Sequence, residues 1–73
     1  MEDFKQRLLE ETQELATKLN KLNEFMASET FIKLSRVEKN LLYNQVATMN
    51  SYIQILGTRL EYYNIEFKYK ENE

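Results

Sequence analysis

Mostly apolar residues recur at helical spacing along the N-terminal third of the chain. Steps of four and three place the members of this stripe on one face of a helix. They are Phe4, Leu8, Thr12, Leu15, Leu19, Leu22 and Met26. Asp3 is a residue type that suits a helix N-cap. We therefore predict a first helix over about residues 3–26.

The periodicity breaks over residues 27–35, and a new helix start follows. Ser28 opens a stretch that favours a single short turn. Ser35 and Glu38 have the spacing of a capping box, in which the serine hydroxyl accepts from the Glu38 backbone and the glutamate reaches back. The sequence thus predicts a connector over 27–35 and a second helix from about Arg36.

The strongest periodic signal lies in this second helix, over about residues 36–63. Its apolar residues advance by four and three without a miss, which is a heptad-like pattern. This core stripe consists of Leu42, Val46, Met49, Ile53, Leu56, Leu60 and Tyr63. We interpret it as the face that packs on the first helix. The predicted fold is all-α, an antiparallel helical hairpin with a long second helix.

After Asn64 the period changes to two. Ile65, Phe67 and Tyr69 alternate with charged residues, which is typical of a short extended segment. We predict an extended C-terminal arm over residues 64–73. Since an isolated strand has nothing to pair with in a helical hairpin, the arm is either a frayed tail or laid on a neighbouring subunit.

Length and composition limit how such a hairpin is stabilised. We treat residues 1–73 as a single domain, and a domain of this size has a marginal core. Small scaffolds usually add disulfides, a metal or a partner chain. The chain has no Cys, so we expect no disulfide. It also has no His, so only oxygen ligands remain, which suit calcium or magnesium rather than zinc, and we expect no metal and no cofactor. The remaining solution is assembly as a homo-oligomer.

Composition also excludes several function classes. Without Cys or His the common nucleophile–base pairs cannot be built, and a single Gly permits no phosphate-binding loop, so we expect no enzyme. A net charge of −2 argues against binding duplex nucleic acid. No apolar run is long enough for a membrane helix or a signal peptide, and we expect a cytoplasmic protein.

One stretch of the second helix has an unusual charge pattern. Charged residues make up 30% of the chain, yet none occurs between Asn40 and Thr58. Neutral polar groups cost less to desolvate than charges, so this helix suits burial on more than one side. Beside the core stripe runs a second stripe, which consists of Leu41, Gln45, Thr48, Tyr52, Ile55, Arg59 and Tyr62.

Two interpretations of the second stripe stay open. It is an oligomer interface, where Tyr and Arg are enriched, or it lines a pocket. In a pocket, Tyr52 or Tyr62 would stack on a base, Gln45 would bind a base edge and Arg59 would hold a phosphate. Arg59 would otherwise pair with an acid of the first helix or of another subunit.

The stretch Leu22–Leu60 resembles very small helical proteins of tailed phages, related to those of crAss-like phages. The resemblance rests on two patterns, F-x-x-S-x-x-F-x-x-L and L-L-x-x-Q-x-x-x-M-x-x-Y-x-x-x-L-x-x-R. Here they are Phe25, Ser28, Phe31 and Leu34, then Leu41, Leu42, Gln45, Met49, Tyr52, Leu56 and Arg59. Small phage proteins of this general type include cyclic-nucleotide sponges of the Sequestin and Lockin type.

This resemblance implies an anti-defence protein that sequesters a cyclic di- or oligonucleotide signal of host CBASS or Thoeris immunity, without catalysis. It implies ligand contacts at Ser28, Gln45, Tyr52 and Arg59, to which the stripe adds Tyr62. The alternative is a helical oligomeric interaction or scaffold module that binds another protein through the neutral face of the second helix.

Overall fold

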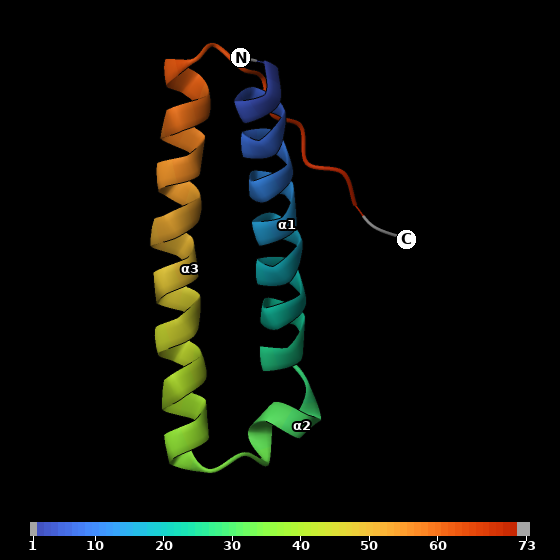
Figure 1. Ribbon diagram of the computed structural model, residues 1–73. Helices are drawn as coiled ribbons and strands as arrows, with labels where there is room; N and C mark the ends of the chain where they lie inside the picture. Colours follow the sequence, from blue (N-terminus) through green and yellow to red (C-terminus); the bar gives the residue numbers. More distant parts are fainter. Residues whose placement is uncertain (1, 72–73) are drawn as a thin grey trace.

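The computed structural model describes residues 2–71. In this part of the chain it has three helices, α1 (Glu2–Met26), α2 (Glu29–Ile32) and α3 (Arg36–Tyr62). Figure 1 shows α1 and α3 side by side and antiparallel, with α2 in the turn between them. The predicted all-α architecture with two long antiparallel helices is confirmed. Residues 1, 72 and 73 of the predicted domain and tail lie outside the described residues.

The two helix starts differ in how well the sequence predicted them. The capping box at α3 is confirmed, because the Glu38 backbone N–H donates to Ser35 Oγ and the Ser35 N–H donates to Glu38 Oε1, both at 3.1 Å. The N-cap prediction for Asp3 is wrong, since α1 already includes Glu2. A single residue of a type that is common at N-caps predicts the first residue of a helix less precisely than a capping box, in which two residues bond to each other.

The core lies where the predicted stripes of α1 and α3 meet. Leu8 and Leu15 of α1 form a buried cluster with Leu56 and Leu60 of α3. Leu56 is fully buried, with no exposed surface. This cluster lies toward the open end of the hairpin, where the chain also folds back over it.

Just after α3, one residue with a left-handed backbone conformation redirects the chain. Asn64 has φ 57°, and the N–H of Ile65 donates to Leu60 O at 2.9 Å. The N–H of Asn64 donates to Glu61 O at 3.0 Å. This is a Schellman-type end, with asparagine in the place where glycine is commonest. It turns the following residues across the end of the hairpin toward α1.

The C-terminal arm packs on its own chain, so neither predicted alternative describes it. Gln13 of α1 donates to Lys70 O at 2.6 Å and accepts from the Lys70 N–H at 3.0 Å. Ile65 and Phe67 pack against the core. Figure 1 shows the arm passing over the end of α1 and running beside that helix. The prediction of a frayed or exchanged tail failed because a glutamine side-chain amide supplies the two hydrogen bonds that a second strand would give.

Candidate functional site

The second stripe of α3 is exposed along its whole length. Leu41 is 62% exposed, Ile55 58% and Tyr62 78%, and the polar members of the stripe are exposed as well. Scattered exposed apolar residues are ordinary, but here Leu41, Ile55 and Tyr62 share one helix face, with polar residues between them. No described residue of this chain covers the stripe.

Tyr52 lies at the edge of the stripe nearest to α1. Its hydroxyl donates a hydrogen bond to Glu11 Oε2. The ring stays 42% exposed. The carboxylate of α1 thus fixes the orientation of an aromatic side chain whose surface is still partly open for a stacking contact.

Arg59 and Tyr62 lie together near the end of α3. They are three positions apart, which makes them neighbours on the helix surface. The Tyr62 ring meets Tyr63 edge-on with centroids 5.0 Å apart, and Tyr63 meets Phe4 in the same way at 4.9 Å. Among residues 3–71, whose side chains the structure describes, Arg59 forms no ion pair. This end of α3 therefore presents an exposed guanidinium beside an aromatic ring that is supported from behind.

Gln45 lies two helical turns before Tyr52 and is exposed. Its amide makes one contact, to Met49 Sδ at 3.9 Å. A sulfur acceptor at this distance is weak, so the amide keeps most of its hydrogen-bonding capacity for a partner or ligand.

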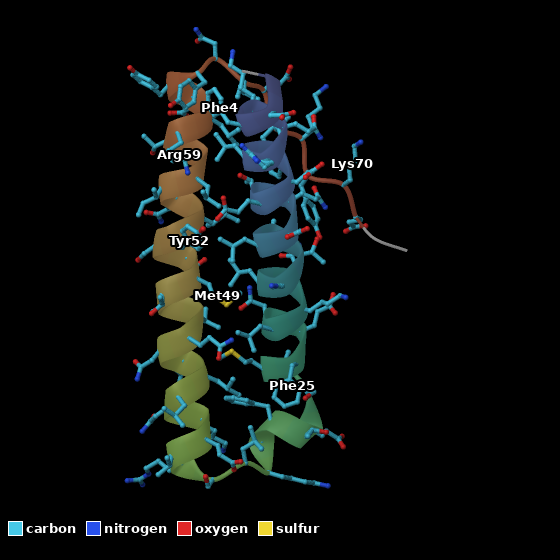
Figure 2. All side chains as sticks on the ribbon, in the orientation of Figure 1. Phe4, Phe25, Met49, Tyr52, Arg59 and Lys70 are labelled. Atoms are coloured by element: carbon cyan, nitrogen blue, oxygen red, sulfur yellow. The ribbon has the colours of Figure 1, made fainter. Side chains whose placement is uncertain are left out.

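Ser28 lies elsewhere in the molecule. Its hydroxyl accepts from the Phe31 N–H at 3.3 Å as the N-cap of α2 and donates to Phe25 O at 2.5 Å. Figure 2 shows Phe25 at the connector end of the hairpin and Arg59 toward the opposite end. The structure therefore groups Arg59 with Tyr62, places Tyr52 and Gln45 further along the same face, and keeps Ser28 apart. A ligand contact at Ser28 stays a prediction.

Sequence reasoning missed Glu11 as the partner of Tyr52. Glu11 is one of several glutamates on α1, and only the packing of the two helices identifies which of them meets the tyrosine. It also missed a hollow of about 550 Å³ between α1 and the arm. That hollow is lined by Leu9, Glu10, Gln13, Glu14, Glu66, Phe67, Lys68 and Lys70. The hollow exists only because the arm runs beside α1. The sequence predicts that the arm is extended but has no local signal for where it runs.

The chemistry of the second stripe is that of binding. Arg59 can hold an anion through a bidentate contact, the tyrosines can stack on planar groups, and Gln45 can donate and accept. Within residues 3–71, the side chains that the structure describes, there is no group of three or more His, Cys, Asp or Glu that could hold a metal ion. The helices found in this range are also too short or too polar to cross a membrane.

Comparisons with known proteins agree with the phage resemblance. A family model described as Sequestin matches residues 2–62. The chain is 37% identical over 57 residues to the "Uncharacterized 7.5 kDa protein in denB-rIIB intergenic region" of Enterobacteria phage T4. The aligned region covers 78% of this chain and 89% of the T4 protein. No solved structure shows significant similarity to the chain. The family match includes the whole second stripe and ends before the arm.

Proposed function

The chain belongs to the Sequestin family, and from this premise we propose that it binds and sequesters a cyclic di- or oligonucleotide second messenger of a host anti-phage defence such as CBASS or Thoeris. It would do so without catalysis, in the cytoplasm of the infected cell, as a homo-oligomer. The observation that carries the proposal is the exposed Arg59 beside Tyr62 on a helix face that is otherwise free of charge.

The proposed contacts follow from ligand chemistry. A cyclic nucleotide presents phosphates and planar bases. Arg59 would hold a phosphate through two parallel N–H···O bonds, because its guanidinium matches the geometry of an oxyanion. Tyr62 and Tyr52 would stack on bases, a contact worth about 1–3 kcal/mol per base. Gln45 would bind a base edge, where its amide both donates and accepts.

The charge distribution supports an anionic ligand at this place. The chain as a whole carries a net charge of −2, which does not attract anions. Between Lys39 and Lys68, however, the only cation is Arg59 and the only carboxylates are Glu61 and Glu66. The residues before Arg59 are neutral as far back as Asn40. On α3 itself Arg59 is thus a lone guanidinium, which attracts a phosphate at close range, while the nearest carboxylate identified on this face is Glu11 of α1 at Tyr52.

A second candidate function has its own observation. Val37, Leu41 and Ile55 are each more than half exposed on α3. Apolar side chains in a line suit the groove or helix of another protein. The alternative is therefore an interaction or scaffold module that binds a different protein through the neutral face of α3.

Titration calorimetry with a panel of cyclic nucleotides tests the proposal. The panel contains cyclic di-AMP, cyclic di-GMP, cyclic GMP–AMP and a cyclic triadenylate. We expect tight binding of at least one, and recovery of the intact nucleotide after heat denaturation, since a sponge does not hydrolyse its ligand. Arg59→Ala should weaken binding at least 100-fold (~3 kcal/mol), because a charge-assisted bidentate contact is lost. The exposed residue Gln54 lies away from the stripe, and Gln54→Ala serves as the matched control with unchanged affinity.

Two results would contradict the proposal. Absence of binding to the whole panel would favour the interaction module. Recovery of a linearised or otherwise cleaved nucleotide would show that the protein is an enzyme.

A further inference from the structure

Glu11 of α1 brings a carboxylate to the second stripe at Tyr52. Its Oε2 atom accepts the hydrogen bond from the Tyr52 hydroxyl, and Glu11 itself is half-buried. Among the side chains of residues 3–71, this is the one hydrogen bond that joins α1 to α3. The proposed binding face therefore includes a residue from outside α3, at the place where a base would stack on Tyr52.

The hydrogen-bonding groups left over at this contact are all acceptors. A tyrosine hydroxyl has one proton, and here that proton is donated to Glu11. An ionised carboxylate has no proton to donate, and each of its oxygens can accept twice. What remains is lone pairs on the Tyr52 oxygen and on both oxygens of Glu11. A ligand edge that meets this pair must therefore present N–H groups.

The common bases differ in the donors along their Watson–Crick edges. Guanine has two adjacent donors there, the N1–H and the N2 amino group, and they match the two oxygens of one carboxylate. Adenine and cytosine have a ring-nitrogen acceptor beside their amino group, and uracil has two carbonyl oxygens beside its N–H. An acceptor that faces a carboxylate leaves both groups without a hydrogen bond, which costs free energy. The Tyr52–Glu11 pair thus favours guanine.

The position of the carboxylate fits a base that stacks on Tyr52. The hydroxyl is at the outer end of the tyrosine side chain, and Glu11 lies against that end. The tyrosine is 42% exposed, and a base on the open side of its ring would lie about 3.5–4 Å from it. The edge of such a base reaches past the hydroxyl to the carboxylate. Stacking on an aromatic ring accepts every base, so the selection between bases comes from Glu11.

The same carboxylate orients the nucleotide along α3. Like charges repel, so a phosphate is disfavoured beside Glu11 and favoured beside Arg59. Arg59 lies seven residues after Tyr52, about 10.5 Å along the helix, and Figure 2 shows the two at separate levels of α3. Base and phosphate are opposite ends of a nucleotide. The base therefore lies at Tyr52 when its phosphate lies at Arg59.

We infer that Glu11 selects the base, and that the sequestered cyclic nucleotide contains guanine. This inference rests on the function proposed above and names the base that its site prefers. Tyr52 stacks on the guanine ring, and the Glu11 carboxylate accepts from its N1–H and its N2 amino group. Glu11 is thus a specificity-determining residue of the second stripe although it belongs to α1.

Calorimetry with cyclic di-GMP and cyclic di-AMP tests the selection, because the two ligands differ only in their bases. The wild type should bind cyclic di-GMP at least 5-fold more tightly, since one bidentate contact to a base discriminates by about 5- to 150-fold. Glu11→Gln should abolish this preference. A glutamine amide donates as well as accepts, and it matches the donor and acceptor of adenine.

Glu14→Gln is the matched control. It removes the same charge from α1, but Glu14 lines the hollow beside the arm and not the second stripe. This variant should keep the wild-type ratio of the two affinities. Both variants should unfold at the wild-type urea concentration, since the amide oxygen in Glu11→Gln still accepts from Tyr52.

Two results would overturn the inference while leaving the proposed function in place. One is a wild type that binds cyclic di-AMP as tightly as cyclic di-GMP. The other is an equal change in both affinities in Glu11→Gln, because a residue that only orients Tyr52 or only contributes charge acts on both ligands by the same factor. Absence of binding to every cyclic nucleotide would refute the proposed function itself, and this inference with it.

Discussion

The two stripes of α3 have the same spacing and opposite surroundings. Leu56 and Leu60 of the core stripe are 0% and 2% exposed, whereas their neighbours Ile55 and Arg59 on the second stripe face outward. A shift of one residue rotates a helix position by about 100°, which is enough to move it from the core to the surface. The heptad spacing alone therefore does not decide which stripe is buried, and in this chain α1 packs on the core stripe.

The residue types on the two stripes differ in polarity. The core stripe is apolar throughout, which suits permanent burial. The second stripe alternates apolar residues with Gln45, Thr48 and Arg59, which have hydrogen-bonding groups to satisfy. Burying a polar group without a hydrogen-bond partner costs free energy, and a group that is exposed part of the time avoids this cost while it is exposed. This difference fits a face that associates reversibly, with another copy or with a ligand.

The largest expected difference between the two stripes is in the free energy of unfolding, when Leu56 and its neighbour Ile55 are each replaced by alanine. Leu56→Ala should lower the free energy of unfolding by about 2–5 kcal/mol, because it leaves a cavity at a core side chain that has no exposed surface. Ile55→Ala, one position away, should change it by less than ~1 kcal/mol in the monomer. Urea unfolding followed by circular dichroism measures both.

The same pair should behave in the opposite way in association. Ile55→Ala should weaken the proposed homo-oligomer in sedimentation experiments, whereas Leu56→Ala should affect it only through the loss of folded protein. Equal destabilisation by the two substitutions at low protein concentration would show that the second stripe contributes to the fold of the single chain, and the distinction between the two faces would fail.

The elements that were predictable from sequence are those with local signals. The apolar stripes of both helices, the capping box at Ser35 and the alternation of Ile65, Phe67 and Tyr69 are all contained within a few residues of chain. The structure agrees with each of them. The second stripe was predictable too, since its spacing and its lack of charge are local properties of α3.

What could not be predicted depends on contacts between distant segments. The arm binds α1 through Gln13, which lies 57 positions before Lys70. No local pattern distinguishes this glutamine from Gln6. The partner of Tyr52 is equally nonlocal, as Glu11 is 41 positions away. The proposed partner of the second stripe is harder still to predict, because it would be another molecule.

A middle-sized effect is expected where the arm covers the core. Phe67 packs against the buried cluster and is only partly exposed, so Phe67→Ala should cost about 2 kcal/mol, less than truncation of a fully buried phenylalanine. Thermal unfolding would measure the loss. Lys68→Ala, whose side chain is 82% exposed, is the control and should have little effect. Because the arm packs on the side of α3 that carries Ile53 and Gly57, away from the second stripe, nucleotide affinity and assembly of the proposed homo-oligomer should not change in either variant. A loss of affinity in folded Phe67→Ala would mean that the arm belongs to the site.

The smallest effect concerns the backbone that both stripes share. Gly57 is the only glycine of the chain and lies inside α3, where glycine costs about 1 kcal/mol relative to alanine. A Cβ atom at this position would meet nothing within 4 Å. It would enter a hollow of about 400 Å³ that Ile53 and Phe67 also line. Gly57→Ala should therefore stabilise the protein by about 0.5–1 kcal/mol and raise Tm by ~4 °C.

Since Gly57 is about 200° around the helix from Ile55, the methyl group touches neither the second stripe nor a second copy packed on it. Unchanged nucleotide affinity in this variant would show that binding depends on the side chains of the stripe, whereas weaker binding together with a higher Tm would show that α3 must flex at Gly57 to accept its ligand.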